Sequence, residues 1–368
     1  MGRTRLGILL GVAAITAASV WTVTPSAATS RLPARLSDQE FWRLSSTFSE
    51  PGGTFHSDNF VSNEGQFQTV IPDLIRRVPR DGFYVGVGPE QNFTYMAAIR
   101  PRMAFIVDIR RGNLQEHLLY KALIEMSADR AEFVARLFSR PRPATLNATS
   151  TVAELFDAVA ASTPTEALYR QNLLAVTRWL TTTHRLPLSA EDLMGIDYIY
   201  RTAFFTDGPG LNYQLTGAGR GAGRGVGTPS YAQLMAMDDG AGRQRSYLAS
   251  EQNFAYLKTL ESNNLVVPVV GDFGGPRALR AVGKYARDND ASIAAFYVSN
   301  VEQYLVADGK WNAFCANVAS MPIDHASTFI RSVRGGGGGR QSGVFAMFRS
   351  SLAAVSDDTR ACAAAGAR

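Results

Sequence analysis

The chain carries two blocks in which short, continuous apolar runs alternate with stretches of helical periodicity. Continuous apolar runs that end in glycine or an acid are typical of strands buried on both faces of a sheet. In helices, apolar residues recur every three or four positions. The first block therefore predicts a strand over 83–88, a helix over 90–99, a strand over 103–109 and a helix over 114–126.

The second block repeats this alternation near the C-terminus. It predicts a strand over 265–273, a helix over 276–287, a strand over 292–300, helical residues over 301–318, a strand over 327–333 and a last apolar strand over 343–348. Strands that alternate with helices favour a mostly parallel sheet with right-handed crossovers. The predicted fold class is α/β, with a doubly wound, mostly parallel sheet of Rossmann-like type.

Between the two blocks lies a long stretch with helical periodicity and a glycine-rich loop at 217–227. Six glycines in eleven residues are incompatible with a regular element, so this loop is expected to be exposed. The middle of the chain is predicted to be a large helical insertion in the α/β domain. The expected organisation is a signal peptide (1–28), an N-terminal segment (29–75), the first half of the α/β domain (76–130), the insertion (131–262), the second half (263–350) and a C-terminal tail (351–368).

Composition and charge narrow the functional classes. Hydrophobic residues make up 46% of the 368 positions and charged residues 19%, which is enough for a sizeable core. The net charge of +5 is spread along the chain without a polybasic run, so no nucleic-acid partner is expected. Two cysteines, Cys315 and Cys362, are compatible either with a disulfide or with two buried thiols.

The first thirty residues resemble an export signal. Arg3 and Arg5 precede an apolar stretch over 6–21, and small residues follow at 24–30. We expect cleavage near Ala27 or Ala28 and a periplasmic or secreted protein; the alternative is an uncleaved N-terminal anchor. Any membrane contact is expected only through this segment.

The most informative unit follows the first predicted strand. A turn containing Gly86 and Gly88 leads into a helix that opens at Glu90, and Asp108 ends the second strand. A glycine turn admits a ligand close to the backbone, and the acid can accept hydrogen bonds from ribose hydroxyls. Gly88 and Asp108 are 20 residues apart (108 − 88), the spacing expected for such a pair. The alternative is a strand–turn–helix unit without a ligand.

Two further groups stand at strand ends. Asp272 follows the third strand, where it either accepts a hydrogen bond from an adenine amino group or caps the helix at Pro276. Ser299 and Asn300 end the fourth strand. Since carboxyl ends of parallel strands converge on one crevice, we expect these groups to meet the glycine turn there.

The ligand is expected to be a ribose-bearing small molecule. The third glycine of the dinucleotide fingerprint is absent, because Gln91 and Asn92 occupy that place, and Glu90 would repel a pyrophosphate. A nicotinamide-dependent oxidoreductase is therefore disfavoured. A ribose with a cationic tail fits better, and S-adenosylmethionine is the common example.

At these residues the chain resembles the class I S-adenosylmethionine-dependent transferases, and most of all the 3-amino-3-carboxypropyl transferases of betaine-lipid synthesis. The resemblance covers residues 84–140, 295–305 and 329–332. It implies S-adenosylmethionine as cofactor and a small molecule or lipid head group as acceptor. The positions that carry it include Asn113, Leu114, Leu118, Lys121, Ala122, Phe133, Arg136, Leu137 and Phe138.

The chain also departs from that family. Pro89 and Glu90 stand where the family has small residues, residues 140–260 have no counterpart, and an exported protein would lie away from a cofactor made in the cytoplasm. The alternative function is therefore an exported, non-catalytic protein that binds a small ligand. The sequence identifies no catalytic base.

Weaker polar features remain. Asp58, Asn63 and Glu64 form a cluster before the first strand, which either folds over the crevice as a lid or simply makes turns. Arg220 and Arg224 either clamp an anionic substrate or lie in solvent. The four histidines are scattered, and His117 is expected to be a packing or surface residue.

The export signal generates a first prediction. The native protein should begin near residue 28 or 29, because the basic, apolar and small-residue regions together direct cleavage there. N-terminal sequencing or intact mass of the native protein measures this. A cytoplasmic chain that still begins at residue 1 or 2 would contradict it.

Overall fold

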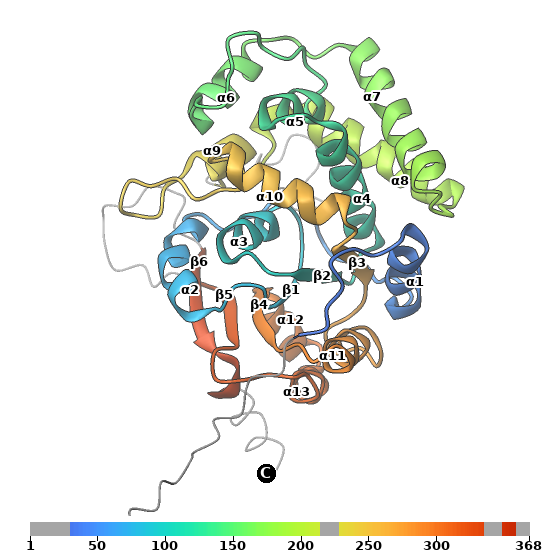
Figure 1. Cartoon of the computed structure of the whole chain (residues 1–368), viewed down its shortest axis with the longest axis vertical. Coiled ribbons are helices and arrows are strands. Elements are labelled where there is room, and N and C mark those ends of the chain that lie inside the picture. Colours follow the sequence, from blue (N-terminus) through green and yellow to red (C-terminus); the bar gives the residue numbers. More distant parts are fainter. Residues whose placement is uncertain (1–29, 214–227, 335–347, 358–368) are drawn as a thin grey trace, which may run out of the picture.

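A computed structural model describes residues 30–213, 228–334 and 348–357. Within them, a six-stranded sheet occupies the centre of the molecule and helices lie on both of its faces (Figure 1). The expected α/β class with a mostly parallel sheet is thereby confirmed. The predicted signal peptide and glycine-rich loop lie outside the described residues, as does Cys362. None of the described helices has the length and apolar character needed to span a membrane.

The sheet has the strand order β3-β2-β1-β4-β5-β6. Its first five strands in the chain pair in parallel, and only β6 is antiparallel to its neighbour β5. The chain builds outwards from β1 to β3 and then returns to β4 on the other side of β1. The strands are β1 (Phe83–Gly86), β2 (Met103–Asp108), β3 (Val266–Val270), β4 (Ile293–Ser299), β5 (Thr328–Arg334) and β6 (Phe348–Ala354).

Only the end of the last predicted strand lies among the described residues, because residues 343–347 fall outside them. β6 begins at Phe348, where the predicted run 343–348 ends, and it continues into the predicted tail. Its register is set by β5, since Arg334 pairs with Phe348 and Thr328 pairs with Ala354. An edge strand of this kind needs no continuous apolar run, because hydrogen bonds to the neighbouring strand define it. The signal for β6 is therefore absent from its own sequence.

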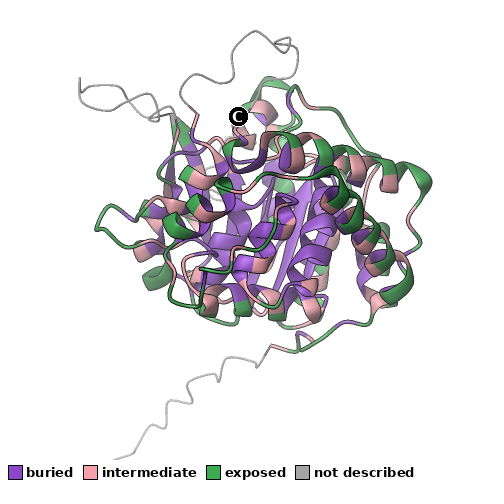
Figure 2. Ribbon diagram, turned by 90° about the horizontal axis from the view of Figure 1, so that it is seen from above, coloured by how far each residue is buried: buried purple, intermediate pink, exposed green. Residues whose placement is uncertain are grey.

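Helices cover both faces of the sheet (Figure 1). Every residue of β1, β2 and β3 is buried, which explains their continuous apolar sequences (Figure 2). The predicted helical stretch 301–318 forms two helices, with Gly309 at a φ of +69° between them. One face carries α3 (Gln91–Ile99), α4 (Arg111–Met126) and α10 (Glu251–Ser262), and the other carries α11 (Ala278–Asp288), α12 (Val301–Ala307) and α13 (Trp311–Ala319).

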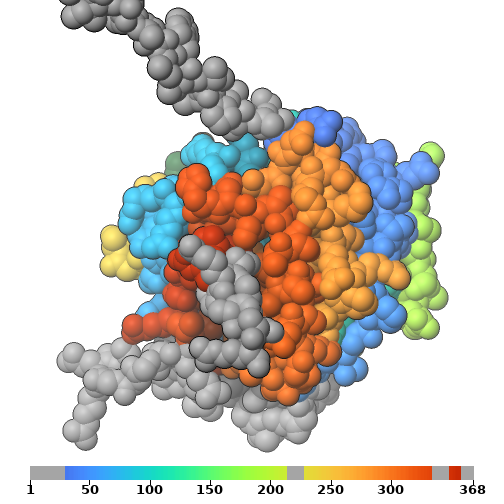
Figure 3. Space-filling model, turned by 90° about the horizontal axis from the view of Figure 1, so that it is seen from below, coloured from blue at the N-terminus to red at the C-terminus, as the bar shows by residue number. Residues whose placement is uncertain are grey.

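The face that carries α11 to α13 is shown in Figure 3, where these C-terminal elements occupy the middle of the surface and the N-terminal residues border them. α1 (Asp38–Phe48) belongs to that border and packs against β3 and α11. Ser37 caps α1 by accepting a hydrogen bond from the N–H of Glu40, a role that serine often takes at a helix N-terminus. A short 3₁₀ turn (Phe67–Val70) and α2 (Ile71–Arg77) lie beside α3.

The helical insertion lies beyond α4 and α10, on the side away from the sheet (Figure 1). α10 was expected to belong to it, but α10 packs on α3 and α4 as part of the layer that covers the sheet. The insertion contains α5 (Arg130–Leu137), α6 (Val152–Ala160), α7 (Glu166–Arg178), α8 (Ala190–Ile199) and α9 (Tyr231–Ala236), with π-helical turns at Trp179–Thr183 and Tyr200–Asp207 and a 3₁₀ turn at Gly208–Gly210.

A charged cluster ties the insertion to α1 and α4. His184 Nδ1 lies 2.6 Å from Asp38 Oδ1, and its Nε2 lies 2.6 Å from Glu125 Oε2. Lys121 Nζ donates to the other oxygen of Glu125 at 2.7 Å. Burial lowers the pKa of His184, but the hydrogen bonds to Glu125 and Asp38 outweigh it, so the pKa is raised above its ordinary value. The imidazolium therefore joins three elements that are distant in sequence.

This cluster predicts a pH-dependent stability. A raised pKa in the folded state means that His184 stabilises the fold fully below about pH 6.5, and that this contribution is lost as the pH rises through the raised pKa. His184→Gln should cost about 1.5–3 kcal/mol of unfolding free energy near pH 6, and less near pH 9. Denaturant titrations at both pH values measure this. His325→Gln, at an exposed histidine, is the matched control, and an equal cost for His184→Gln at both pH values would contradict the prediction.

Candidate functional site

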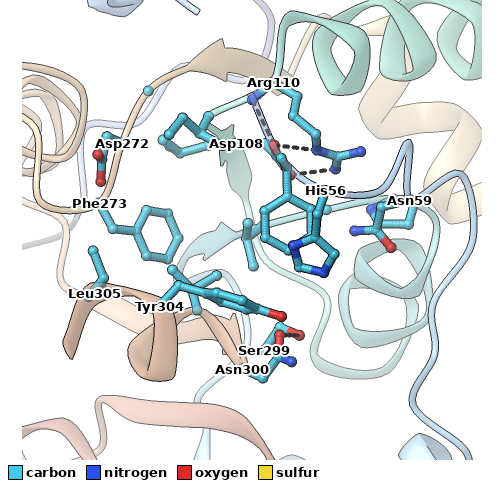
Figure 4. A pocket seen from close by; sticks show the side chains of 18 of the residues that line it. His56, Asn59, Asp108, Arg110, Asp272, Phe273, Ser299, Asn300, Tyr304 and Leu305 are labelled. Carbon is cyan, nitrogen blue, oxygen red and sulfur yellow. Dashed lines mark hydrogen bonds and ion pairs between the residues drawn. The ribbon is translucent and has the colours of Figure 1, made fainter. Parts of the chain in front are cut away.

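A cavity of about 520 Å³ lies at the carboxyl ends of β1, β2, β3 and β4. Five of the seven predicted site residues line it, namely Gly88, Asp108, Asp272, Ser299 and Asn300. Thus the sequence-predicted crevice exists at the point where the strand order reverses between β1 and β4. The other walls come from the N-terminal segment (Thr54, Phe55, His56, Asn59, Ser62 and Asn63), from Tyr213 of the insertion and from Tyr304, Leu305 and Asp308 in and after α12 (Figure 4).

The turn after β1 is held by one side-chain amide. Nδ2 of Asn92 lies 2.9, 3.1 and 2.8 Å from the carbonyl oxygens of Val87, Gly88 and Pro89. Gly88 has a φ of +76°, which favours glycine, and it faces the cavity. His117 Nε2 lies 2.9 Å from the same Gly88 carbonyl. Because burial lowers the pKa of His117 to about 4, its imidazole is neutral and this nitrogen donates the hydrogen bond. His117 is thus the packing residue that its sequence context predicts.

Gly86 does not line the cavity, in contrast to its predicted role. A Cβ at this position would lie 1.9 Å from Oδ1 of Asn92 and 2.9 Å from the ring of Tyr84. The glycine therefore leaves space for the Asn92 carboxamide, whose Oδ1 also accepts a hydrogen bond from the Tyr84 hydroxyl at 2.9 Å. Asn92 stands where the fingerprint would have its third glycine, and its side chain hydrogen-bonds to the carbonyl groups of the turn.

Glu90 also lies outside the cavity wall. Its side chain is fully buried and its Oε1 accepts a hydrogen bond from the N–H of Ser62. Burial raises the pKa of Glu90 to about 8, so the carboxyl group is neutral near pH 7. The expected repulsion between Glu90 and a pyrophosphate is therefore wrong, because the Glu90 carboxyl group is neutral and does not line the cavity.

Asp108 ends β2 inside the cavity, but its carboxylate is already paired. Oδ1 accepts from the N–H and Nε of Arg110 at 2.9 and 3.0 Å, and Oδ2 accepts from Nη2 at 2.8 Å. Arg110 Nη1 also donates to the carbonyl of Asp58 in the N-terminal segment. A ribose at this place would meet a neutral acid–guanidinium pair instead of a bare carboxylate.

Asp272 has a similar arrangement at the end of β3. Lys310 Nζ lies 2.6 Å from its Oδ2, and the N–H of Gly274 donates to its Oδ1 at 2.8 Å. One interpretation of the sequence proposed that Asp272 caps the following helix, but it does not. Glu50 does so, because its Oε1 accepts from the N–H groups of Arg277 and Ala278 at 2.7 and 2.8 Å.

The end of β4 contributes a strained turn. Ser299 has a φ of +50°, which is uncommon for a residue with a side chain, and Asn300 precedes α12. The Ser299 hydroxyl donates to Glu64 Oε1 at 2.6 Å. Aromatic rings lie beside this turn, where Figure 4 shows Tyr304 and His56 near Ser299 and Asn300. The ring centroid of Phe55 is 5.1 Å from that of Tyr304, in an edge contact, and 4.0 Å from that of His56.

Sequence reasoning missed several residues of this wall. Phe55, His56, Tyr304 and Arg110 all line the cavity, and none was a candidate. The one available signal was the polar and aromatic segment before β1, which was interpreted either as a lid or as turns. The segment packs along the cavity, with Asn63 in its wall and Glu64 buried directly behind it.

The site can bind a small molecule through paired charges, hydroxyl and amide groups and aromatic rings. Its volume is within the range of about 300–1,000 Å³ that is usual for small-molecule sites. Among the described residues, no group of three or more His, Cys, Asp or Glu side chains is placed to hold a metal ion.

The turn generates a double-mutant prediction. Gly86→Ala should cost about 2 kcal/mol or more, because its Cβ displaces Asn92 and leaves buried carbonyls without a donor. In an Asn92→Ala background the same change should cost little, since the carboxamide is gone. Denaturant titrations of the four proteins measure the coupling energy, which should exceed about 1 kcal/mol. Strictly additive effects would show that the glycine at position 86 is not required to accommodate the Asn92 side chain.

Comparison with known proteins gives a family but no activity. None of the curated proteins compared with the chain matches it. A family model described as a domain of unknown function, DUF7790, matches residues 59–188 and 222–357. The two matched segments contain all the strands and most of the cavity wall. Because they cover well over half of the chain, this protein belongs to the DUF7790 family.

Proposed function

We propose that the cavity binds a ribose-bearing small molecule, with S-adenosylmethionine as the first candidate. On this proposal the protein is a transferase that uses S-adenosylmethionine to modify a small molecule or a lipid head group. The observation that carries it is the convergence of Gly88, Asp108, Asp272 and Ser299, from four different strands, on one cavity. The sequence predicted each of these four residues as a contact of a ribose-bearing ligand.

The place of the cavity supports this proposal. Ligands of open α/β sheets bind at the carboxyl ends of the strands, where the strand order reverses. The order β3-β2-β1-β4-β5-β6 is the one found in doubly wound nucleotide-binding folds. The proposal therefore includes a sheet of the Rossmann-like, methyltransferase type, and the resemblance of residues 84–140 to the class I transferases supports it.

The charges of the cavity favour a nucleoside without phosphates. Arg110 and Lys310, the two cations that contact the acids of the cavity wall, are both paired with carboxylates. A pyrophosphate would have to compete with Asp108 and Asp272 for them. This competition, and not a charge on Glu90, is the reason to disfavour a dinucleotide.

One observation favours a second candidate, a non-catalytic protein that binds a small ligand. Both oxygens of Asp108 are occupied by Arg110, so a ribose diol finds few free acceptor positions there. The N-terminal segment favours the same candidate, because an exported protein lies outside the compartment that makes S-adenosylmethionine. We propose export on the sequence of residues 1–30, whose basic, apolar and small-residue regions follow the order of a signal peptide.

Calorimetric titration with S-adenosylmethionine, S-adenosylhomocysteine, adenosine and NAD tests this function. Asp108→Asn should weaken binding of the adenosyl ligands by about tenfold or more, because it removes the charge of the acceptor that Oδ2 still offers to the ribose beside Arg110. Asp272→Asn should cost less, since one contact to the adenine amino group is involved.

The unfolding midpoint must be measured alongside, because Asp108→Asn also leaves Arg110 without its carboxylate. A loss of stability with unchanged affinity would assign Asp108 to the fold alone. If none of the four ligands binds with a Kd below about 1 mM, the transferase proposal falls.

A further inference from the structure

Glu64 carries a buried carboxylate that no cation among the described residues balances. Its side chain is fully buried. Oε1 accepts hydrogen bonds from the hydroxyls of Tyr297 and Ser299 at 2.7 and 2.6 Å. Oε2 accepts from Gln91 Nε2 at 3.1 Å and from the Ser350 hydroxyl at 3.0 Å. All four donors are neutral, so they satisfy the oxygens of the carboxylate without neutralising its charge.

This carboxylate stands directly behind the cavity. Tyr297 and Ser299, which both bond to its Oε1, line the cavity, and so does Ser62, whose hydroxyl accepts from the N–H of Glu64 at 3.1 Å. The left-handed backbone of Ser299 directs its side chain to Glu64 at the turn between β4 and α12. Three residues that line the cavity are therefore hydrogen-bonded directly to Glu64.

The hydroxyl groups in front of Glu64 can only accept further hydrogen bonds. A hydroxyl has one hydrogen and two lone pairs. Since Tyr297 and Ser299 both donate to Glu64, any further hydrogen bond to their oxygens must come from a donor. A ligand group that fits this wall must therefore be a donor.

Two acids of the cavity wall have the cationic partner that Glu64 lacks among the described residues. Asp108 is paired with Arg110, and Asp272 is paired with Lys310. A buried charge without a partner is costly, and a ligand cation at this wall would supply the partner. A metal ion does not fit, because the described residues place no suitable group of ligands together. An ammonium group, with three donor hydrogens and a compact positive charge, matches both requirements.

We propose that the wall formed by Tyr297 and Ser299, in front of Glu64, is a binding site for a protonated amino group. This inference rests on the proposed nucleoside site, and it adds the class of the second ligand group. The amino group comes either from an amino-acid tail on the nucleoside itself or from a separate amine substrate. Both sources place the same chemistry against the same wall.

The first arm of the test compares two nucleosides, one with and one without the amino-acid tail that carries the amino group. S-adenosylhomocysteine carries an ammonium group, whereas 5′-methylthioadenosine lacks the amino-acid tail. Glu64→Gln keeps the shape of the side chain and removes its charge. Calorimetry should show the affinity for S-adenosylhomocysteine reduced by about tenfold or more, with that for 5′-methylthioadenosine within about twofold. Glu302→Gln is the matched control, because Glu302 on the adjacent α12 pairs with Arg331 and does not line the cavity.

The second arm tests a separate amine. Ethanolamine is titrated into the wild type and Glu64→Gln, with and without saturating 5′-methylthioadenosine, and ethylene glycol serves as its uncharged analogue. Binding of ethanolamine to the wild type but not to Glu64→Gln, with unchanged response to S-adenosylhomocysteine, assigns the site to a second substrate. If Glu64→Gln does not fold, Ser299→Ala replaces it, and the amine-bearing probe should still be selectively weakened.

The outcomes separate the two proposals. If the nucleosides bind but Glu64→Gln changes neither amine-bearing probe, the amino-group site is wrong and the nucleoside site stands. If no nucleoside binds, the proposed function is wrong, and the ethanolamine titrations alone test the amino-group site. If no amine binds in a way that depends on Glu64, the amino-group site is wrong.

Discussion

The contact between Asn92 and the turn after β1 is the constraint on which the site depends. One carboxamide reaches the carbonyl groups of three successive residues, 87–89, and holds Gly88 with a positive φ against the cavity. The carboxamide fits only because Gly86 has no side chain. His117 adds a second donor from α4, in the neutral form that burial imposes on it. β1, α3 and α4 are thereby joined at one end of the cavity.

The charges around the cavity follow from this geometry. Where the chain brings a cation close to an acid, as at Asp108 with Arg110, the wall is neutral. Glu64 enters the structure from the N-terminal segment and meets only neutral donors from α3, β4 and β6. The site is therefore asymmetric, with compensated charges at the ends of β2 and β3 and an uncompensated one behind the end of β4.

The first five strands were all predicted from the sequence, and complete burial makes the signal of the first three the simplest to explain. β1, β2 and β3 are covered by helices on both faces, so each had to be a continuous apolar run, and such a run is visible without any knowledge of neighbours. β6 is defined by its pairing with β5 at the edge of the sheet, and most of its side chains are only partly buried. Its own residues therefore carried no such signal.

The sequence by itself determined the α/β class, the glycine turn and the acids at the strand ends, because these depend on local periodicity and on spacings of about 20 residues. Only the tertiary structure decided what those groups contact. Glu90 lies next to the turn in sequence, yet its side chain is fully buried outside the cavity wall, and burial raises its pKa so that it is neutral. Lys310, Glu50 and Glu64 reach their partners across tens to hundreds of residues. Such pairings have no sequence period, because they result from the way the helices and the N-terminal segment pack around the sheet.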